Sequence, residues 1–466
     1  MNFLTCLQWY WIISPGPHNL IMAQQTQTVT WKLRGCSLVY KARRKYYVPI
    51  ILPSSPVTPS CLPNQEIAYS TTDQLLHRST AESFAKQVPL EFTLYNLTEK
   101  NMDFGFNLYR KISLKHDNNV FFSPLSVSFV MAVFMLAAEG ETYKQIARGT
   151  NLHLFQDKEN FHPLPALFKQ LNENITANEE LVLQRGSFSF IQKNFRLKEP
   201  FLNLSKQYFD MEFLSVDFHN STHAKNVINQ NINKKTKGKI PKLFEELDQH
   251  AKLVFVDYVL FKGKWLQPFN TRFTELDTFH IDKYRNIQVP MMFKSDKVAS
   301  TSDKNLGCIV LKLPYRGSAH MLIAMPEKEG DYASLEDHIT AELVESWLRN
   351  MKTRKMDIFF PKFKLDQKYQ MHELLHALRI QNLFTRKADL SQLTDQRFVK
   401  VSKVRLTTVI EVDEKGTEAA AVSGSEITAY SMPPTIKVNR PFLFMIYEET
   451  FKALLFMGRV VNPTEL

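Results

Sequence analysis

Helical periodicity begins about one hundred residues into the chain. Phe104, Leu108 and Ile112 stand four residues apart, which places their side chains on one face of an amphipathic helix. The segment 127–138 is apolar on every side but is short. Since a membrane span needs about 20 apolar residues, we expect a buried helix there.

Runs of branched and aromatic residues predict the strands. The segment 253–263 is too apolar for a sheet edge and predicts a central strand, while Phe-rich runs at 356–366, 441–449 and 453–461 predict others. Strands and helices are interspersed without a repeat and without a strand–helix–strand rhythm. The pattern therefore indicates an α+β protein with one large domain over residues 91–466.

Residues 1–90 differ from this body. They lack sustained periodicity and contain a proline cluster, so we expect a leader and a flexible N-terminal tail. The tail carries +5 of the net charge of +11, and the remaining charge is too dilute to predict nucleic-acid binding. Of the four cysteines only Cys308 lies in the body, so no disulfide framework is expected there.

The stretch 414–434 reads as an exposed loop, yet its first half alternates like a strand. Both charges between 417 and 427, Glu418 and Glu426, fall on even positions. The odd positions are uncharged and mostly small: Thr417, Ala419, Ala421, Ser423, Ser425 and Ile427. Charges confined to one side of a two-residue period are typical of a strand with one buried face. The small side chains suggest that this strand enters a crowded place.

The sharpest catalytic spacing is an H-E-x-x-H motif at residues 372–376. On a helix it would place two imidazoles and a glutamate as a zinc protease requires. No third ligand follows at the usual spacing, because the next glutamate is Glu411, beyond a strand-like segment. The leucines of the motif fit an ordinary amphipathic helix, so we expect neither a metal site nor an enzyme.

Four N-x-S/T sequons favour an extracellular glycoprotein, with candidate sites at Asn96, Asn174, Asn203 and Asn220. The apolar N-terminus lacks a basic region and a clear cleavage site, so the signal peptide is atypical. No apolar stretch reaches the length of a membrane span, and direct membrane insertion is not expected.

Several motifs, in this order along the chain, resemble the serpin superfamily. They are NVFFSPLSVS at 119–128, TKGKIPKLF at 236–244, LFKGKWLQPF at 260–269, EVDEKGTEAAA at 411–421, RPFLFMIYEE at 440–449 and FMGRVVNP at 456–463. The resemblance covers residues 100–466 and implies a monomer with the serpin fold. That fold has three β-sheets, about nine helices and an exposed reactive-centre loop at about 414–434.

The family also implies a mechanism. A secreted serpin inhibits serine proteases as a suicide substrate: the protease cleaves the loop, the loop inserts into a sheet, and the acylated protease is trapped. Matching the family pattern places the reactive bond at Tyr430–Ser431. The hinge then comprises Glu414, Gly416, Thr417, Glu418, Ala419, Ala420 and Ala421. A hydroxyl such as that of Thr417 can be buried where a charge could not.

The segments 282–292, 343–369 and 425–438 resemble plasma serpins that regulate blood coagulation. This resemblance implies factor Xa and factor XIa as targets. Tyr430 suits a chymotrypsin-like pocket, whereas clotting proteases favour arginine. The resemblance also implies how this poor fit is offset: protein Z, calcium and phospholipid act as external cofactors that confine the inhibitor beside factor Xa. The implied protein Z contacts are Asp117, Asp282, Tyr284 and Asp337.

The sequence departs from the family pattern in two places, which concern heparin binding and the opening of the central sheet. The basic residues expected to bind heparin, Lys158 and Lys169, are few, and acids flank Lys158. Many serpins keep a histidine where the central sheet opens, and in this chain Leu406 occupies that position. The alternative to an inhibitor is a non-inhibitory serpin that carries a ligand, although no bulky or charged side chain obstructs the buried face of the hinge.

Overall fold

The computed structural model divides into two compact units, residues 1–86 and 87–466. The described residues are 28–33, 36–43, 46–52, 93–155, 163–177, 180–328, 330, 332–415 and 433–465. In the first unit, strands β1 (Thr28–Leu33), β2 (Cys36–Arg43) and β3 (Tyr46–Leu52) form an antiparallel meander. We expected no regular structure in this tail, so the meander is an unforeseen element.

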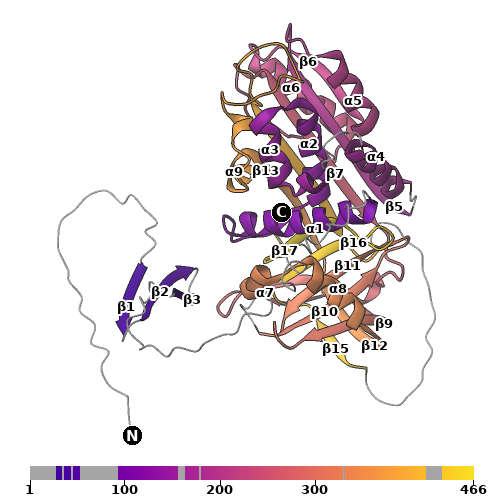
Figure 1. Ribbon diagram of the computed structural model, residues 1–466. Coiled ribbons are helices and arrows are strands. Elements are labelled where there is room, and N and C mark those ends of the chain that lie inside the picture. The colour runs from indigo at the N-terminus through magenta and orange to yellow at the C-terminus, as the bar shows by residue number, and fades with distance from the viewer. Residues whose placement is uncertain are drawn as a thin grey trace, which may run out of the picture. The chain divides into compact units, whose positions relative to one another are not determined.

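The described part of the second unit contains nine α-helices (Figure 1). They are α1 (Leu94–Ser113), α2 (Pro124–Ala137), α3 (Gly140–Gly149), α4 (Pro163–Thr176), α5 (Glu199–Phe209), α6 (Ser221–Lys235), α7 (Tyr332–His338), α8 (Ala341–Asn350) and α9 (Met371–Ala377). None of these described helices is long and apolar enough to cross a bilayer. The amphipathic helix and the buried apolar helix expected from the sequence are present as α1 and α2.

Helix α2 is buried along its whole length, as the apolar segment predicts. Its N-terminus is capped by the Ser123 hydroxyl, which accepts the Ser126 backbone N–H at 3.1 Å. Pro124 stands at the first helical position, where its missing N–H costs nothing. The helix contacts β7 and β17, so it lies in the core beneath the five-stranded sheet.

The five-stranded sheet has the order β13-β14-β7-β5-β6. Its strands are β13 (Phe363–Gln370), β14 (Lys403–Val412), β7 (Leu253–Gly263), β5 (Leu181–Gln192) and β6 (Met211–Val216). Strand β7 occupies the middle position, which confirms the predicted central strand. In this sheet β7 runs parallel to β14 and antiparallel to β5.

The remaining strands of the body join in one nine-stranded sheet, with β8 paired to β9 off the main path. They are β15 (Thr435–Lys437), β12 (Lys352–Pro361), β9 (Asn286–Asp303), β10 (Cys308–Pro314), β11 (Ala319–Pro326), β16 (Phe442–Glu448), β17 (Ala453–Val460), β4 (Val120–Phe122) and β8 (Glu275–His280). The described chain thus has three sheets, but the third is the β1–β3 meander of the other unit.

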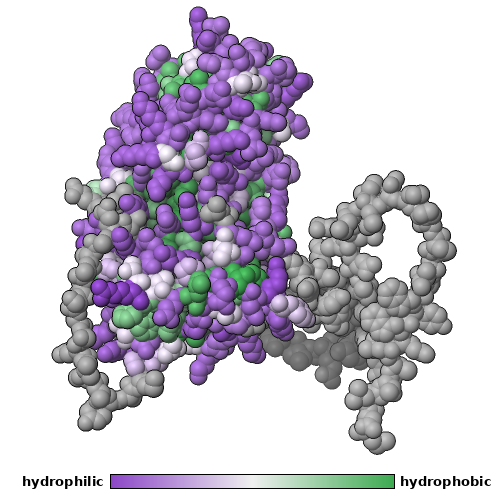
Figure 2. Space-filling view, turned by 180° about the vertical axis from the view of Figure 1, so that it is seen from behind, coloured by the Kyte–Doolittle hydropathy of each residue, from purple (hydrophilic) through white to green (hydrophobic). Residues whose placement is uncertain are grey.

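Figure 1 shows most helices of the body gathered around the five-stranded sheet, while β9, β10, β12 and β15 form the other half with α7 and α8. The surface turned toward the viewer in Figure 2 is mainly polar, with an apolar patch in the lower half of the body. Between β7 and β9 the chain exposes four large hydrophobic side chains, those of Leu266, Phe273, Leu276 and Tyr284.

Candidate functional site at the seam of the five-stranded sheet

The candidate site is the seam between β7 and β14. The two strands pair in parallel from Lys403 opposite Val254 to Ile410 opposite Phe261. The chain leaves β14 at Val412 and continues into the stretch 414–434 that alternates like a strand. If that stretch turned back between β14 and β7, it would run antiparallel to both neighbours. The sheet therefore offers a position for one more strand.

The base of this segment is fixed to the body. The indole N–H of Trp265 donates to the Asp413 carbonyl oxygen at 2.9 Å. The Glu414 carboxylate is almost buried and accepts from Lys362 Nζ at 2.9 Å and from the Thr274 hydroxyl at 2.8 Å. Burial by itself raises the pKa of Glu414, but these donors outweigh it and leave the pKa below its usual value. Glu414 is therefore held as a charged anchor where the hinge begins.

A polar cluster lies on the β7 side of the seam. The fully buried Asp257 accepts from the Ser126 hydroxyl at 2.7 Å, from Ser187 at 3.1 Å and from the Arg185 guanidinium at 3.2 Å. Arg185 also lies over the Phe129 ring, 3.9 Å from its centroid. Burial raises the pKa of Asp257 even though its three partners oppose that effect. These contacts tie β7 to β5 and to helix α2.

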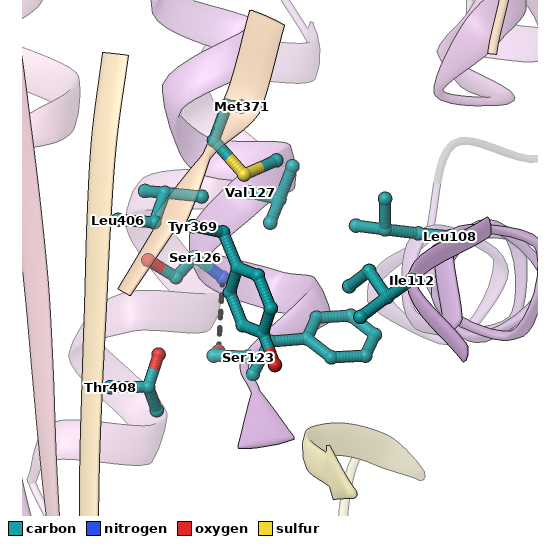
Figure 3. Close-up of a pocket in the computed structure, with 10 residues that line it drawn as sticks. Leu108, Ile112, Ser123, Ser126, Val127, Tyr369, Met371, Leu406 and Thr408 are labelled. Atoms are coloured by element: carbon teal, nitrogen blue, oxygen red, sulfur yellow. Dashed lines mark hydrogen bonds between the residues drawn. The ribbon is translucent and has the colours of Figure 1, made fainter. Parts of the chain in front are cut away.

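The β14 side of the seam at this level is apolar. Leu406 stands opposite Asp257 in the parallel register and is almost buried. It lines a cavity of about 10 Å³ together with Ser123, Tyr369 and Thr408 (Figure 3). A leucine side chain cannot hydrogen-bond to Asp257, so no side-chain bond bridges the strands at this pair. The two halves of the sheet can therefore separate at this level without breaking a polar side-chain contact.

Most of the predicted loop residues lie outside the described part of the chain. This holds for the reactive bond, Tyr430 and Ser431, and for the hinge positions from Gly416 to Ala421. Of the predicted hinge, the structure describes Glu414. Lys158, one of the two expected heparin contacts, also falls outside the described residues. The other, Lys169 on α4, lies 3.8 Å from Glu173, which partly neutralises it.

Two of the predicted protein Z contacts flank one buried arginine. The guanidinium of Arg459 bonds to Glu336 Oε1 at 2.5 Å and to the backbone oxygens of His116 and Asn118. Asp117 lies within the exposed turn held by these bonds, and Asp337, also exposed, follows Glu336 on α7. The structure thus joins the elements that carry Asp117 and Asp337.

The other two predicted contacts lie in the turn between β8 and β9. The Asp282 carboxylate accepts the Tyr284 backbone N–H at 2.9 Å and the Arg285 Nε–H at 2.7 Å. These bonds lower its pKa and stabilise the turn. The Tyr284 side chain is 93% exposed, which is unusual for an aromatic residue and leaves its ring open to a partner. No described hydrogen bond joins this turn to α1 or α7.

Three of the four sequon asparagines, Asn174, Asn203 and Asn220, are exposed on helices or a helix cap. Asn96 is half-buried in the first turn of α1, and the hydroxyl of its partner Thr98 is buried against the Phe451 carbonyl oxygen. The structure therefore presents three of these sites more openly than the fourth.

The H-E-x-x-H motif forms the surface helix α9. The Glu373 carboxylate accepts from Lys115 Nζ at 2.9 Å and lies 3.9 Å from His372 Nε2, with both side chains of that second pair exposed to solvent. Within the described residues, no group of three or more histidine, cysteine, aspartate or glutamate side chains is arranged to hold a metal ion. The motif is accounted for as an amphipathic helix.

The sequence analysis did not find the Asp257 cluster or the Lys362–Glu414 pair. A signal for the first was present, because Asp257 is the one acid inside the apolar run 253–263. A buried acid in a central strand needs partners. Its partners come from α2 and β5, and their convergence cannot be read from the linear chain.

A family model described as Serpin (serine protease inhibitor) matches residues 99–463. The chain belongs to the serpin family, and the resemblance stated from its motifs is confirmed. Its family is one of protease inhibitors, so the expectation that it is not an enzyme is confirmed as well.

Three known serpins are similar to this chain. Human protein Z-dependent protease inhibitor is 57% identical over 373 residues, which cover 79% of this chain and 83% of that protein. The crystal structure of mouse protein Z-dependent protease inhibitor is 55% identical with a TM-score of 0.74, and the match covers 80% of this chain and 98% of that one. Human thyroxine-binding globulin also shares the fold, at 34% identity and a TM-score of 0.73, over 80% of this chain and all of that one.

Proposed function

We propose that this serpin inhibits a serine protease as a suicide substrate and regulates blood coagulation. The observation that carries the proposal is the β7–β14 seam, a parallel strand pair whose β14 end leads directly into the alternating segment. Opening the seam breaks one parallel ladder. Inserting a strand would create two antiparallel ladders, which are more stable per residue. Insertion is therefore favourable once the loop is released from its far end.

The chemistry of trapping begins at Tyr430. The protease serine Oγ attacks the Tyr430 carbonyl carbon, the bond to the Ser431 nitrogen breaks, and the new amine takes a proton from the protease histidine. The acyl ester then joins Tyr430 to the enzyme. Insertion of residues 416–430 at about 3.3 Å each would carry that ester roughly 50 Å along the sheet. Deacylation fails if the enzyme is deformed on arrival.

Protein Z is the expected cofactor for factor Xa, because the relatives of this chain are named for it and their sequences are more than half identical. A tyrosine at the reactive bond fits the arginine-selective pocket of a clotting protease poorly. Docking through protein Z, with calcium, on phospholipid would raise the effective concentration without improving that fit. The proposed contacts are Asp117, Asp282, Tyr284 and Asp337. Factor XIa is the proposed second target.

The test is a denaturing gel of the protein with factor XIa, and separately with factor Xa plus protein Z, calcium and phospholipid. A band at the summed mass is expected in both. The band should vanish for Thr417→Arg, which puts a charge where the inserting strand must be buried, and should persist for the control Thr417→Ser. Cleaved serpin with free active protease would refute trapping. Factor Xa trapping that does not need protein Z would refute only the cofactor role.

A carrier function has less support from the structure. Ligand pockets for small molecules usually enclose about 300–1,000 Å³. The cavity at the seam and its neighbour beside Arg185 each enclose about 10 Å³, roughly the space of one water molecule. A carrier need not gain heat stability when the chain is cleaved within 414–434. An inserting inhibitor should gain heat stability on cleavage.

The remaining properties follow from the same assignment. We place the protein in the extracellular fluid as a monomer, with glycans on Asn174, Asn203 and Asn220 in preference to Asn96. Heparin binding at Lys158 and Lys169 is a weaker element of the proposal, because Glu173 competes for Lys169. Glycosidase treatment of the secreted protein and single Asn→Gln variants would check the glycan assignments.

A further inference from the structure

Phe398, in the loop that leads into β14, is exposed in a strained backbone conformation. Its side chain is 78% exposed, and its φ of 60° lies in the left-handed region that bulky side chains disfavour. Two residues that follow it, Val399 and Val401, are buried. An aromatic ring therefore projects into solvent from a segment whose neighbours are packed in the core.

The loop around Phe398 is held on both sides. Before it, the Thr394 hydroxyl donates to the Arg196 carbonyl oxygen at 2.7 Å. After it, the Val401 backbone N–H donates to the Leu383 carbonyl oxygen at 3.1 Å. Strain of this kind persists only where the surrounding structure over-determines it, and it clusters at functional positions. Phe398 is thus an exposed aromatic side chain on a loop anchored at both ends, and aromatic residues are enriched in protein–protein interfaces.

The position of Phe398 relates it to the inserted loop. It precedes β14 at Lys403, so it lies at the end of the seam opposite the hinge. Suppose that the inserted strand turns back after Val412 and that Thr417 then pairs with Val412. In an antiparallel pair the two residue numbers always add up to the same value, 829 in this case, so Tyr430 would pair with residue 399. If the turn lies one residue later, so that residue 418 pairs with residue 413, Tyr430 would pair with Val401. Either way, the acylated tyrosine would arrive within about three residues of Phe398.

We infer that Phe398 is a contact residue for the captured protease, which it meets only after loop insertion has carried the enzyme to this end of the sheet. The inference rests on the proposed trapping mechanism. The partner is a globular serine protease joined to the serpin through the ester at Tyr430. The exposed cations Arg397 and Lys400 stand on either side of Phe398 in the sequence, so the loop offers a basic surface along with the aromatic side chain.

This contact would affect the covalent serpin–protease complex and would not affect the initial binding of the protease to the loop. The tether at Tyr430 is short, so a fixed ring close to its end presses on the protease surface around the acylated serine. Holding that surface away from its relaxed position would slow the attack of water on the ester, because deacylation needs an intact oxyanion hole. Loss of the ring should shorten the life of the complex and leave its rate of formation unchanged.

The experiment uses the full-length protein and purified covalent complexes with factor XIa. Complexes of the wild type, Phe398→Asn and Phe273→Asn are incubated, and recovery of chromogenic factor XIa activity gives the release rate. Asparagine tolerates a φ of 60°, and the control removes a comparably exposed aromatic side chain elsewhere. We expect Phe398→Asn to release protease on the order of tenfold faster, the loss typical of one aromatic anchor.

Two further readouts separate the outcomes. The melting temperature of free Phe398→Asn should equal or exceed that of the wild type, because the strain is relieved, whereas a purely structural role would lower it. Phe398→Tyr should retain slow release. Equal release rates for the wild type and Phe398→Asn would overturn the inference while leaving trapping intact. Absence of a wild-type complex would overturn the proposed function itself. If Phe398→Asn folds poorly, Phe398→Gly serves the same comparison.

Discussion

The buried pair of Arg185 and Asp257 should show strong thermodynamic coupling. Their exposed side-chain fractions are 9% and 0%, so either charge left alone stays in a low-dielectric interior. Removing one partner of such a pair costs about 3–5 kcal/mol, whereas removing both is often nearly neutral. Arg185→Met and Asp257→Asn should therefore each destabilise the closed protein by that amount. For a domain of this size this lowers the melting temperature by roughly 1 °C per kcal/mol.

The assay is a double-mutant cycle on the first urea-unfolding transition. The double variant should recover most of the loss, with a coupling energy of at least ~2 kcal/mol. The matched control is Lys235→Met, which breaks the short but half-exposed pair with Glu212 and should cost less than ~1 kcal/mol. If the effects of Arg185→Met and Asp257→Asn add within about 0.5 kcal/mol, the cluster does not anchor β7 as argued.

Two further predictions concern single buried groups, and a third concerns the Lys362–Glu414 pair. Burial lowers the pKa of Lys294 to about 8, so between pH 8 and 10.5 the unfolded chain binds more protons and stability rises with pH. Lys294→Met should stabilise the protein by up to about 3 kcal/mol at pH 7 and should flatten that rise in a pH series of urea melts. Burial likewise lowers the pKa of His320 to about 3, so stability should fall as pH drops from 6.5 toward 3, and His320→Phe should remove that part of the acid sensitivity. Glu414→Gln and Lys362→Met should each lower the free energy of unfolding, measured by urea melts, by a similar amount of about 1 kcal/mol, and the double variant should lose no more; additive losses would show that the two groups do not act as a pair.

The pattern of apolar residues was sufficient to predict the helices and strands that are buried on every side. Helix α2 is buried on all sides, so an apolar run described it completely, and β7 lies in the middle of a sheet covered on both faces. The meander at 28–52 escaped prediction, because short strands that pair only with one another carry little periodic signal. The number of sheets in the body depended on edge pairing between distant strands, such as β4 with β17, which no local pattern encodes.

The sequence by itself determined the family, the class of fold and the alternation within 417–427, since these depend on residue order and on motifs that lie close together in the chain. Only the tertiary structure decided how the seam is built. It brings Arg185, Ser126 and Asp257 together from three elements and sets Leu406 across from them. It also exposes Phe398, in a left-handed backbone conformation, at the end of the seam opposite the hinge. The physical reason is that burial and hydrogen bonding act through space, and a residue's neighbours in space are fixed by the packing of the whole chain.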